Sequence, residues 1–146
     1  KYFILKVDPK KRILFDPNES IDFNGNTGPF IQYAYARIQS LIRKDQFLNT
    51  KTALDININE KEKDILKQLI QFPIAIKSAA DNYSPALIAN YVFELVKSFN
   101  SYYQSNTILK VHDLEIKNFR LTLSNKVGEV IKNSMKLLGV EVPKKM

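Results

Sequence analysis

The chain has 146 residues, of which 45% are hydrophobic, and it contains no cysteine. This composition allows one buried core, excludes disulfides and thiolate metal sites, and predicts a cytoplasmic protein with no membrane-spanning segment. The formal net charge of +7 is compatible with nucleic-acid binding, although many soluble proteins carry a similar surplus on their solvated surface.

The first part of the chain is predicted to contain a short extended segment and then a turn. Residues 11–16 are rich in strand-forming side chains and are followed by Pro17, so they predict a strand whose sheet partners are missing. Residues 24–28 contain two glycines and predict a turn. A helix is predicted from about Pro29 to residue 44, because proline needs no amide donor in the first turn of a helix. A loop is expected at residues 45–59.

Two shorter helices are predicted next. Asn59 can cap a helix over residues 60–72, with Glu62 reaching back to it from three residues further on. Pro73 permits a new helix to begin, which we expect to extend to about residue 83.

Two long helices complete the predicted fold. One covers residues 84–104, with Ser84 as its cap, and the other covers residues 114–138 and stops at Gly139. One side chain, Phe93, points away from the apolar stripe of its helix and needs another packing partner or a ligand. These patterns predict a mainly α fold, a helical bundle preceded by a short extended or β segment.

Several residues could carry chemistry but favour structural roles. His112, beside Asp113 and Glu115, lacks the nucleophile or further ligands of a hydrolase or zinc site, so Asp113 is interpreted as a helix cap and His112 as a loop residue. The glycine-containing turn at residues 24–28 lacks the lysine and the spacing of a P-loop. Arg120 is interpreted as a structural residue with a carboxylate partner or with its stem across the core.

A second group of side chains could form an RNA platform on one helix. Tyr91 and Phe93 supply ring faces, Asn90 supplies an amide, and Lys97 supplies a cation on neighbouring turns. The alternative is that Tyr91 belongs to the core while the other side chains form a solvated surface. The residues alone favour this alternative.

Three sequence segments resemble one enzyme family. Residues 24–38, Asn-Gly-Asn-Thr-Gly-Pro-Phe-Ile-Gln-Tyr-Ala-Tyr-Ala-Arg-Ile, resemble the junction between the catalytic and anticodon-binding domains of arginyl-tRNA synthetases. Phe15-Asp16-Pro17 fits the same family, and Arg120-Leu121 with residues 135–146 resembles its C-terminus. The chain is therefore similar to a C-terminal fragment of a class I arginyl-tRNA synthetase that contains the DALR-type anticodon-binding domain.

The resemblance implies domain boundaries and binding residues. Residues 1–28 would be the tail of the catalytic region with a connecting loop, and residues 29–146 would be the helical anticodon-binding domain. In this family the helix that matches residues 84–99 carries aromatic residues that receive the anticodon loop, and the C-terminal methionine lies near that loop. The implied tRNA-binding residues are Tyr91, Phe93, Asn90, Lys97 and Met146, with Tyr91 carried over first.

The resemblance also implies the activity of a longer parent enzyme, which attaches arginine to its tRNA using ATP with Mg²⁺. Its His-Ile-Gly-His-like and Lys-Met-Ser-Lys-Ser-like motifs do not occur in this chain. L-arginine and ATP would bind the missing catalytic domain, so this chain is expected to be inactive alone and to hold no catalytic residue, cofactor or metal. Its implied partner is arginine tRNA, and a monomer is expected.

Two other interpretations remain open. The related domain of cysteinyl-tRNA synthetases has the same helical type, although the Asn-Thr-Gly-Pro junction and the final Glu-Val-Pro-Lys-Lys-Met favour the arginine enzymes. A helical protein-interaction module without RNA binding would suit the neutral middle third of the chain, residues 59–104.

Overall fold

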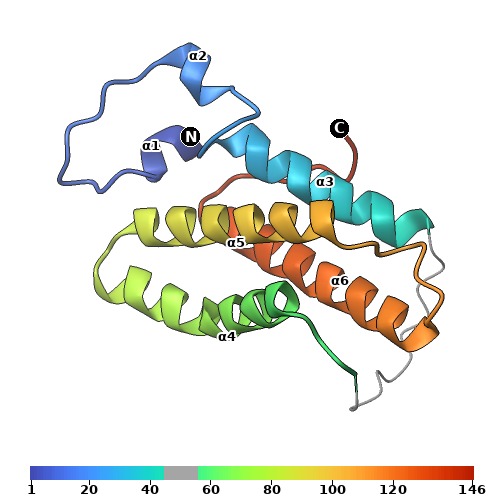
Figure 1. Ribbon diagram of the computed structural model, residues 1–146. Coiled ribbons are helices and arrows are strands. Elements are labelled where there is room, and N and C mark those ends of the chain that lie inside the picture. Colours follow the sequence, from blue (N-terminus) through green and yellow to red (C-terminus); the bar gives the residue numbers. More distant parts are fainter. Residues whose placement is uncertain (45–55) are drawn as a thin grey trace.

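The computed structural model describes residues 1–44 and 56–146 and contains six helices in these two ranges (Figure 1). The prediction of a mainly α helical bundle is confirmed. The helices are α1 (Tyr2–Leu5), α2 (Pro17–Ser20), α3 (Gly28–Lys44), α4 (Glu60–Asp81), α5 (Pro85–Ser105) and α6 (Leu114–Leu137).

The predicted strand over residues 11–16 is wrong. This stretch forms neither strand nor helix, and the described residues contain no other strand. A strand is stable only when a neighbour accepts and donates its backbone hydrogen bonds, and residues 1–44 and 56–146 supply no such neighbour. Of the predicted loop at residues 45–59, only 56–59 fall within the described residues, and they are not helical.

The four long helices enclose one core. In Figure 1, α5 lies between α3 and α4, and α6 packs against both α3 and α5. Gly128 of α6 permits this contact, because a Cβ atom at this position would lie only 3.1 Å from Cγ2 of Ile38. The largest fully buried side chains come from all four helices and include Ile31, Ile38, Ile65, Leu95, Phe99, Tyr102, Leu121, Ile131 and Met135.

Most of the predicted helix ends are confirmed. Asn59 accepts a hydrogen bond from the backbone N of Glu62 (3.0 Å), and Glu62 accepts one from the backbone N of Asn59 (2.8 Å). Asp113 caps α6 by accepting from two backbone amides of its first turn. Gly139 follows α6 with φ of +65°, the left-handed conformation that glycine adopts most readily. Ser84 occupies the capping position of α5, but its side chain makes no capping hydrogen bond.

The predicted break at Pro73 is wrong, because α4 continues through this residue. Proline removes one backbone donor from a helix, but packing against a neighbouring helix can hold the helix together. Here Phe72 stacks on Tyr91 of α5, and Gln68 donates to the Ser98 hydroxyl of α5 (2.7 Å). Tertiary contacts with α5 therefore outweigh the local signal.

The beginning of the chain is anchored to the bundle. Tyr2 and Phe3 of α1 are buried, and the Tyr2 hydroxyl lies within hydrogen-bond distance of the carbonyl oxygen of Ala89 on α5 (2.8 Å) and of Oδ1 of Asn26 (2.7 Å). Within the described ranges, every helix is too short or too polar to cross a lipid bilayer.

Candidate nucleic-acid interface

Arg37 of α3 lies between two tyrosine rings. Its guanidinium carbon is 4.9 Å from the centroid of the Tyr33 ring on α3 and 4.9 Å from that of Tyr103 on α5. Tyr33 and Arg37 are four residues apart, so they are neighbours on one face of the helix. Nη1 of Arg37 also donates to Oδ1 of Asn100 on α5 (2.9 Å). These contacts hold the guanidinium in a fixed orientation beside two aromatic faces.

The first of two hollows beside Arg37 has a volume of about 440 Å³, and we call it the tail hollow because the final residues of the chain line it. Those residues run along α3, where Gln32 donates to the carbonyl oxygen of Glu141 (2.7 Å) and Nη1 of Arg43 donates to that of Lys144 (2.9 Å). Its lining comprises Tyr33, Ala36, Arg37, Ser40, Leu41, Arg43, Lys44, Tyr103, Leu109, Lys145 and Met146.

The second hollow has a volume of about 600 Å³, and we call it the loop hollow because the loop before α3 forms one wall. That wall carries Phe23, which is 57% exposed and packs edge-to-face on Tyr33, with ring centroids 6.4 Å apart. Tyr33, itself 47% exposed, and Arg37 line both hollows. The remaining lining is Asn24, Phe30, Lys97, Asn100, Ser101 and Gln104.

The charge of this surface favours an anionic ligand. Among the described residues that line the two hollows, five are basic and none has an acidic side chain. Exposed aromatic faces, side-chain amides and cations are the groups with which proteins bind unpaired nucleotides. The described residues contain no group of three or more histidine, aspartate or glutamate side chains that could hold a metal ion.

The structure places Tyr91 on a different side of α5, against α4. Its hydroxyl donates to the carbonyl oxygen of Gln68 (2.8 Å), and its ring stacks on Phe72 with centroids 5.6 Å apart. Burial raises the pKa of Tyr91 to about 12. The tyrosine carried over first from the family resemblance is thus held by α4 rather than grouped with Arg37.

The other predicted binding residues divide between the two hollows and their surroundings. Met146 lines the tail hollow and Lys97 lines the loop hollow, where it also pairs with Glu94 (3.5 Å). Phe93 is half-buried and packs on Phe30, with ring centroids 5.7 Å apart. Phe30 is therefore a packing partner for this side chain, one of the two alternatives expected from the sequence. Asn90 is exposed and accepts a hydrogen bond from Asn26 (3.3 Å). A single platform containing all five predicted residues is therefore absent from the described structure.

The sequence pattern predicted no binding role for Tyr33, Arg37 or Tyr103. Part of the signal was present, since an aromatic residue and an arginine four positions apart lie together on a helix. The contribution of Tyr103 was not visible, because it comes from another helix, 66 residues after Arg37.

Comparison with known proteins identifies the family. The family described as "DALR anticodon binding domain" matches residues 31–146. The chain belongs to this family. The chain is also similar to the arginine–tRNA ligase of Flavobacterium psychrophilum, with 54% identity over an alignment that covers the whole chain and 24% of the relative. The arginine–tRNA ligase of Parabacteroides distasonis is 49% identical over the whole chain, which covers 25% of that relative.

A solved structure supports the same resemblance. The arginyl-tRNA synthetase of Thermus thermophilus matches 99% of this chain and 25% of its own, with 28% sequence identity and a TM-score of 0.92. The chain therefore spans about a quarter of the length of the relatives that it matches. The resemblance to arginyl-tRNA synthetases that the sequence predicted is confirmed.

Proposed function

We propose that this DALR domain is the tRNA-binding part of an arginine–tRNA ligase and that the tail and loop hollows receive unstacked nucleotides of the anticodon loop. The observation that carries this proposal is Arg37, which contacts the rings of Tyr33 and Tyr103 on a surface whose described lining has no acidic side chain. The names of the relatives support arginine tRNA as the ligand.

The side chains around Arg37 suggest how an anticodon loop would bind. A base can stack on the exposed face of Tyr33 or on Phe23, while the amides of Asn100 and Gln104 offer hydrogen bonds to base edges. The cations along the tail hollow would attract the phosphates. In this proposal Lys97 contacts a phosphate and Met146 contacts a base. Roles for Tyr91, Phe93 and Asn90 in tRNA binding stay predictions.

The longer protein would carry out the complete reaction, in which arginine, ATP and tRNA give arginyl-tRNA, AMP and pyrophosphate. We expect arginine, ATP and Mg²⁺ to bind outside this chain, because its sequence contains neither of the nucleotide-handling motifs. The domain would hold the tRNA while its acceptor end reacts elsewhere. A monomeric protein in the cytoplasm is part of the same proposal.

A charge-matched pair of variants tests this function. Arg37→Gln removes the guanidinium, whereas Lys126→Gln removes a positive charge from an exposed pair with Glu129 on α6, outside the lining of both hollows. We expect Arg37→Gln to weaken binding of arginine tRNA about tenfold or more and Lys126→Gln to weaken it less than about twofold. Wild-type affinity should fall steeply between two salt concentrations.

The opposite results would favour a different role. If the wild-type protein binds no tRNA, or if its affinity does not depend on salt, the domain is better described as a protein-interaction module. If Arg37→Gln and Lys126→Gln bind equally well, tRNA binds elsewhere on the domain.

A further inference from the structure

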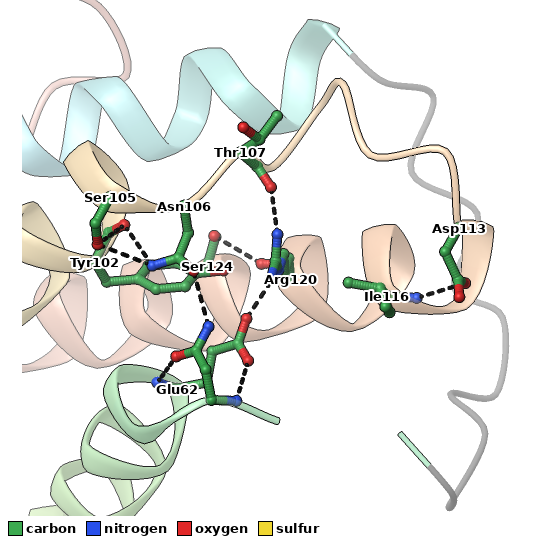
Figure 2. Close-up of polar contacts among 10 residues, drawn as sticks. Glu62, Tyr102, Ser105, Asn106, Thr107, Asp113, Ile116, Arg120 and Ser124 are labelled. Carbon is green, nitrogen blue, oxygen red and sulfur yellow. Dashed lines mark hydrogen bonds and ion pairs between the residues drawn. The ribbon is translucent and has the colours of Figure 1, made fainter. Parts of the chain in front are cut away.

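A buried ion pair joins α4 to α6 at one end of the bundle. Glu62 is 2% exposed, and its Oε1 accepts a hydrogen bond from Nε of Arg120 (2.8 Å). Its other oxygen, Oε2, accepts from the backbone N of Asn59 (2.8 Å), so both carboxylate oxygens are used. Figure 2 shows Glu62 and Arg120 facing each other across the two helices. The structural role predicted for Arg120 is confirmed by this pairing.

The guanidinium of Arg120 also holds the segment that connects α5 to α6. Its Nη1 donates to the carbonyl oxygen of Thr107 (2.6 Å), on the side opposite Glu62 in Figure 2. A second link starts at the same end of α4, where Nδ2 of Asn59 donates to Oδ1 of Asn106 (2.8 Å). Two neighbouring residues of the connecting segment are therefore tied to the start of α4.

The segment that these links hold forms part of the tail hollow. Ile108, next to Thr107, is buried in the core, and Leu109 lines the hollow together with Tyr103. Glu62 and Arg120 are not among the described residues that line either hollow. The hydrogen bond to Thr107 gives this ion pair a structural route to Leu109, two residues further along the chain.

We infer that Glu62 and Arg120 are positioning residues for nucleotide binding, which fix the wall of the tail hollow formed by Leu109 and Tyr103. This inference rests on the proposed function, because it assigns the tail hollow to a nucleotide. A buried ion pair is a weak source of stability compared with packed apolar side chains. A planar guanidinium, however, joins a carboxylate and a carbonyl in fixed directions, and so it determines where Thr107 lies.

The test compares two variants of α6 in the protein as it occurs in the cell. Arg120→Lys keeps the charge but loses the planar fork that joins Glu62 to Thr107. Ile131→Val removes one buried methyl group from the core and serves as the control for a general loss of stability. At a temperature where both variants are folded, we expect arginine tRNA to bind Arg120→Lys about tenfold more weakly than wild type and Ile131→Val within about twofold of it.

A double-mutant cycle separates positioning from a structural role. If the ion pair acts through Leu109, then Leu109→Ala should weaken tRNA binding in the wild-type background and have much less effect when combined with Arg120→Lys. Additive effects of the two substitutions would overturn the inference, as would a folded Arg120→Lys variant with wild-type affinity.

A milder variant provides the test if Arg120→Lys does not fold. Asn59→Asp keeps an oxygen that can cap α4 but loses the amide that donates to Asn106. We expect tRNA affinity to fall about threefold, and unchanged affinity would contradict the inference. If wild-type protein binds no tRNA, the proposed function itself fails, and the inference fails with it.

Discussion

Tyr91 has a ring and a hydroxyl that could bind a nucleotide, but both groups make packing contacts within the protein. Its hydroxyl donates a hydrogen bond to the Gln68 carbonyl, and its ring is stacked on Phe72, so α4 contacts both the hydroxyl and one face of the ring. By contrast, Tyr33 leaves 47% of its surface exposed while one side of its ring contacts Arg37. Its greater exposure therefore favours Tyr33 over Tyr91 as a stacking residue.

We expect Tyr91→Phe to lower the free energy of unfolding by about 1 kcal/mol, because the Gln68 carbonyl loses its donor, and Tyr91→Ala to lower it by about 3 kcal/mol. Urea denaturation measures both values. If Tyr91 serves only the fold, arginine tRNA should bind the folded variants as tightly as wild type. A folded Tyr91→Ala variant that binds tenfold more weakly would instead place Tyr91 in the interface.

Single residues were predictable where their partners lie close in sequence. Asn59 with Glu62, and Asp113 with the first turn of α6, are local motifs that require only a few neighbouring residues. The carboxylate partner of Arg120 and the second ring beside Arg37 come from distant helices. A sequence pattern reports which residues share a helix face, but it does not report which helix covers that face.

At the scale of elements, α4 departs most from its sequence pattern. Pro73 lies inside a continuous helix that runs from Glu60 to Asp81. The cost of an internal proline is about 3 kcal/mol relative to alanine in an otherwise regular helix. Contacts of Phe72 and Gln68 with α5 on the N-terminal side of Pro73 offset part of that cost.

We therefore expect Pro73→Ala to raise the free energy of unfolding by about 1 to 3 kcal/mol, since alanine restores a backbone donor without removing a described contact with α5. Urea denaturation provides the measurement. Ala75→Pro is the reverse control and should lower stability by a comparable or larger amount. A loss of stability in Pro73→Ala would show that packing of α4 on α5 depends on a local distortion made by proline.

The elements that the sequence predicted well are those with strong signals at both ends. Helices α3, α5 and α6 have regular apolar spacing and begin or end at proline, a capping residue or glycine, and their observed bounds agree with the predicted ones to within about two residues. The strand at residues 11–16 failed because side-chain preference cannot supply a pairing neighbour. The division of the chain into two domains, residues 1–28 and residues 29–146, stays a prediction.

Across the whole molecule, buried tyrosines join elements that are distant in sequence. Tyr2 connects the start of the chain to α5, and Tyr91 connects α5 to α4. Tyr102 is fully buried near Glu62, and its hydroxyl has no hydrogen-bond partner among the described residues. Burial raises the pKa of each of these tyrosines and of Tyr35, and the Glu62 carboxylate contributes to the increase at Tyr102.

These shifts predict that the fold loses stability in alkali. Below the ordinary tyrosine pKa of 10.0 the phenols are protonated in both states, so their contribution to stability does not change with pH. Above that value the unfolded chain releases protons that the folded chain retains, and stability should fall by about 1.4 kcal/mol per pH unit for each such tyrosine. Urea denaturation at several pH values between about 9 and 11.5 measures this slope.

Two phenylalanine variants assign the alkaline slope to burial. Tyr102→Phe removes one buried phenol. The loss of unfolding free energy above pH 10 should therefore become shallower by about 1.4 kcal/mol per pH unit, the contribution of one proton. Tyr83 is 90% exposed, and Tyr83→Phe removes no buried phenol, so this variant should leave the slope unchanged. If both variants keep the wild-type slope, the Tyr102 phenol does not contribute to the loss of stability in alkali.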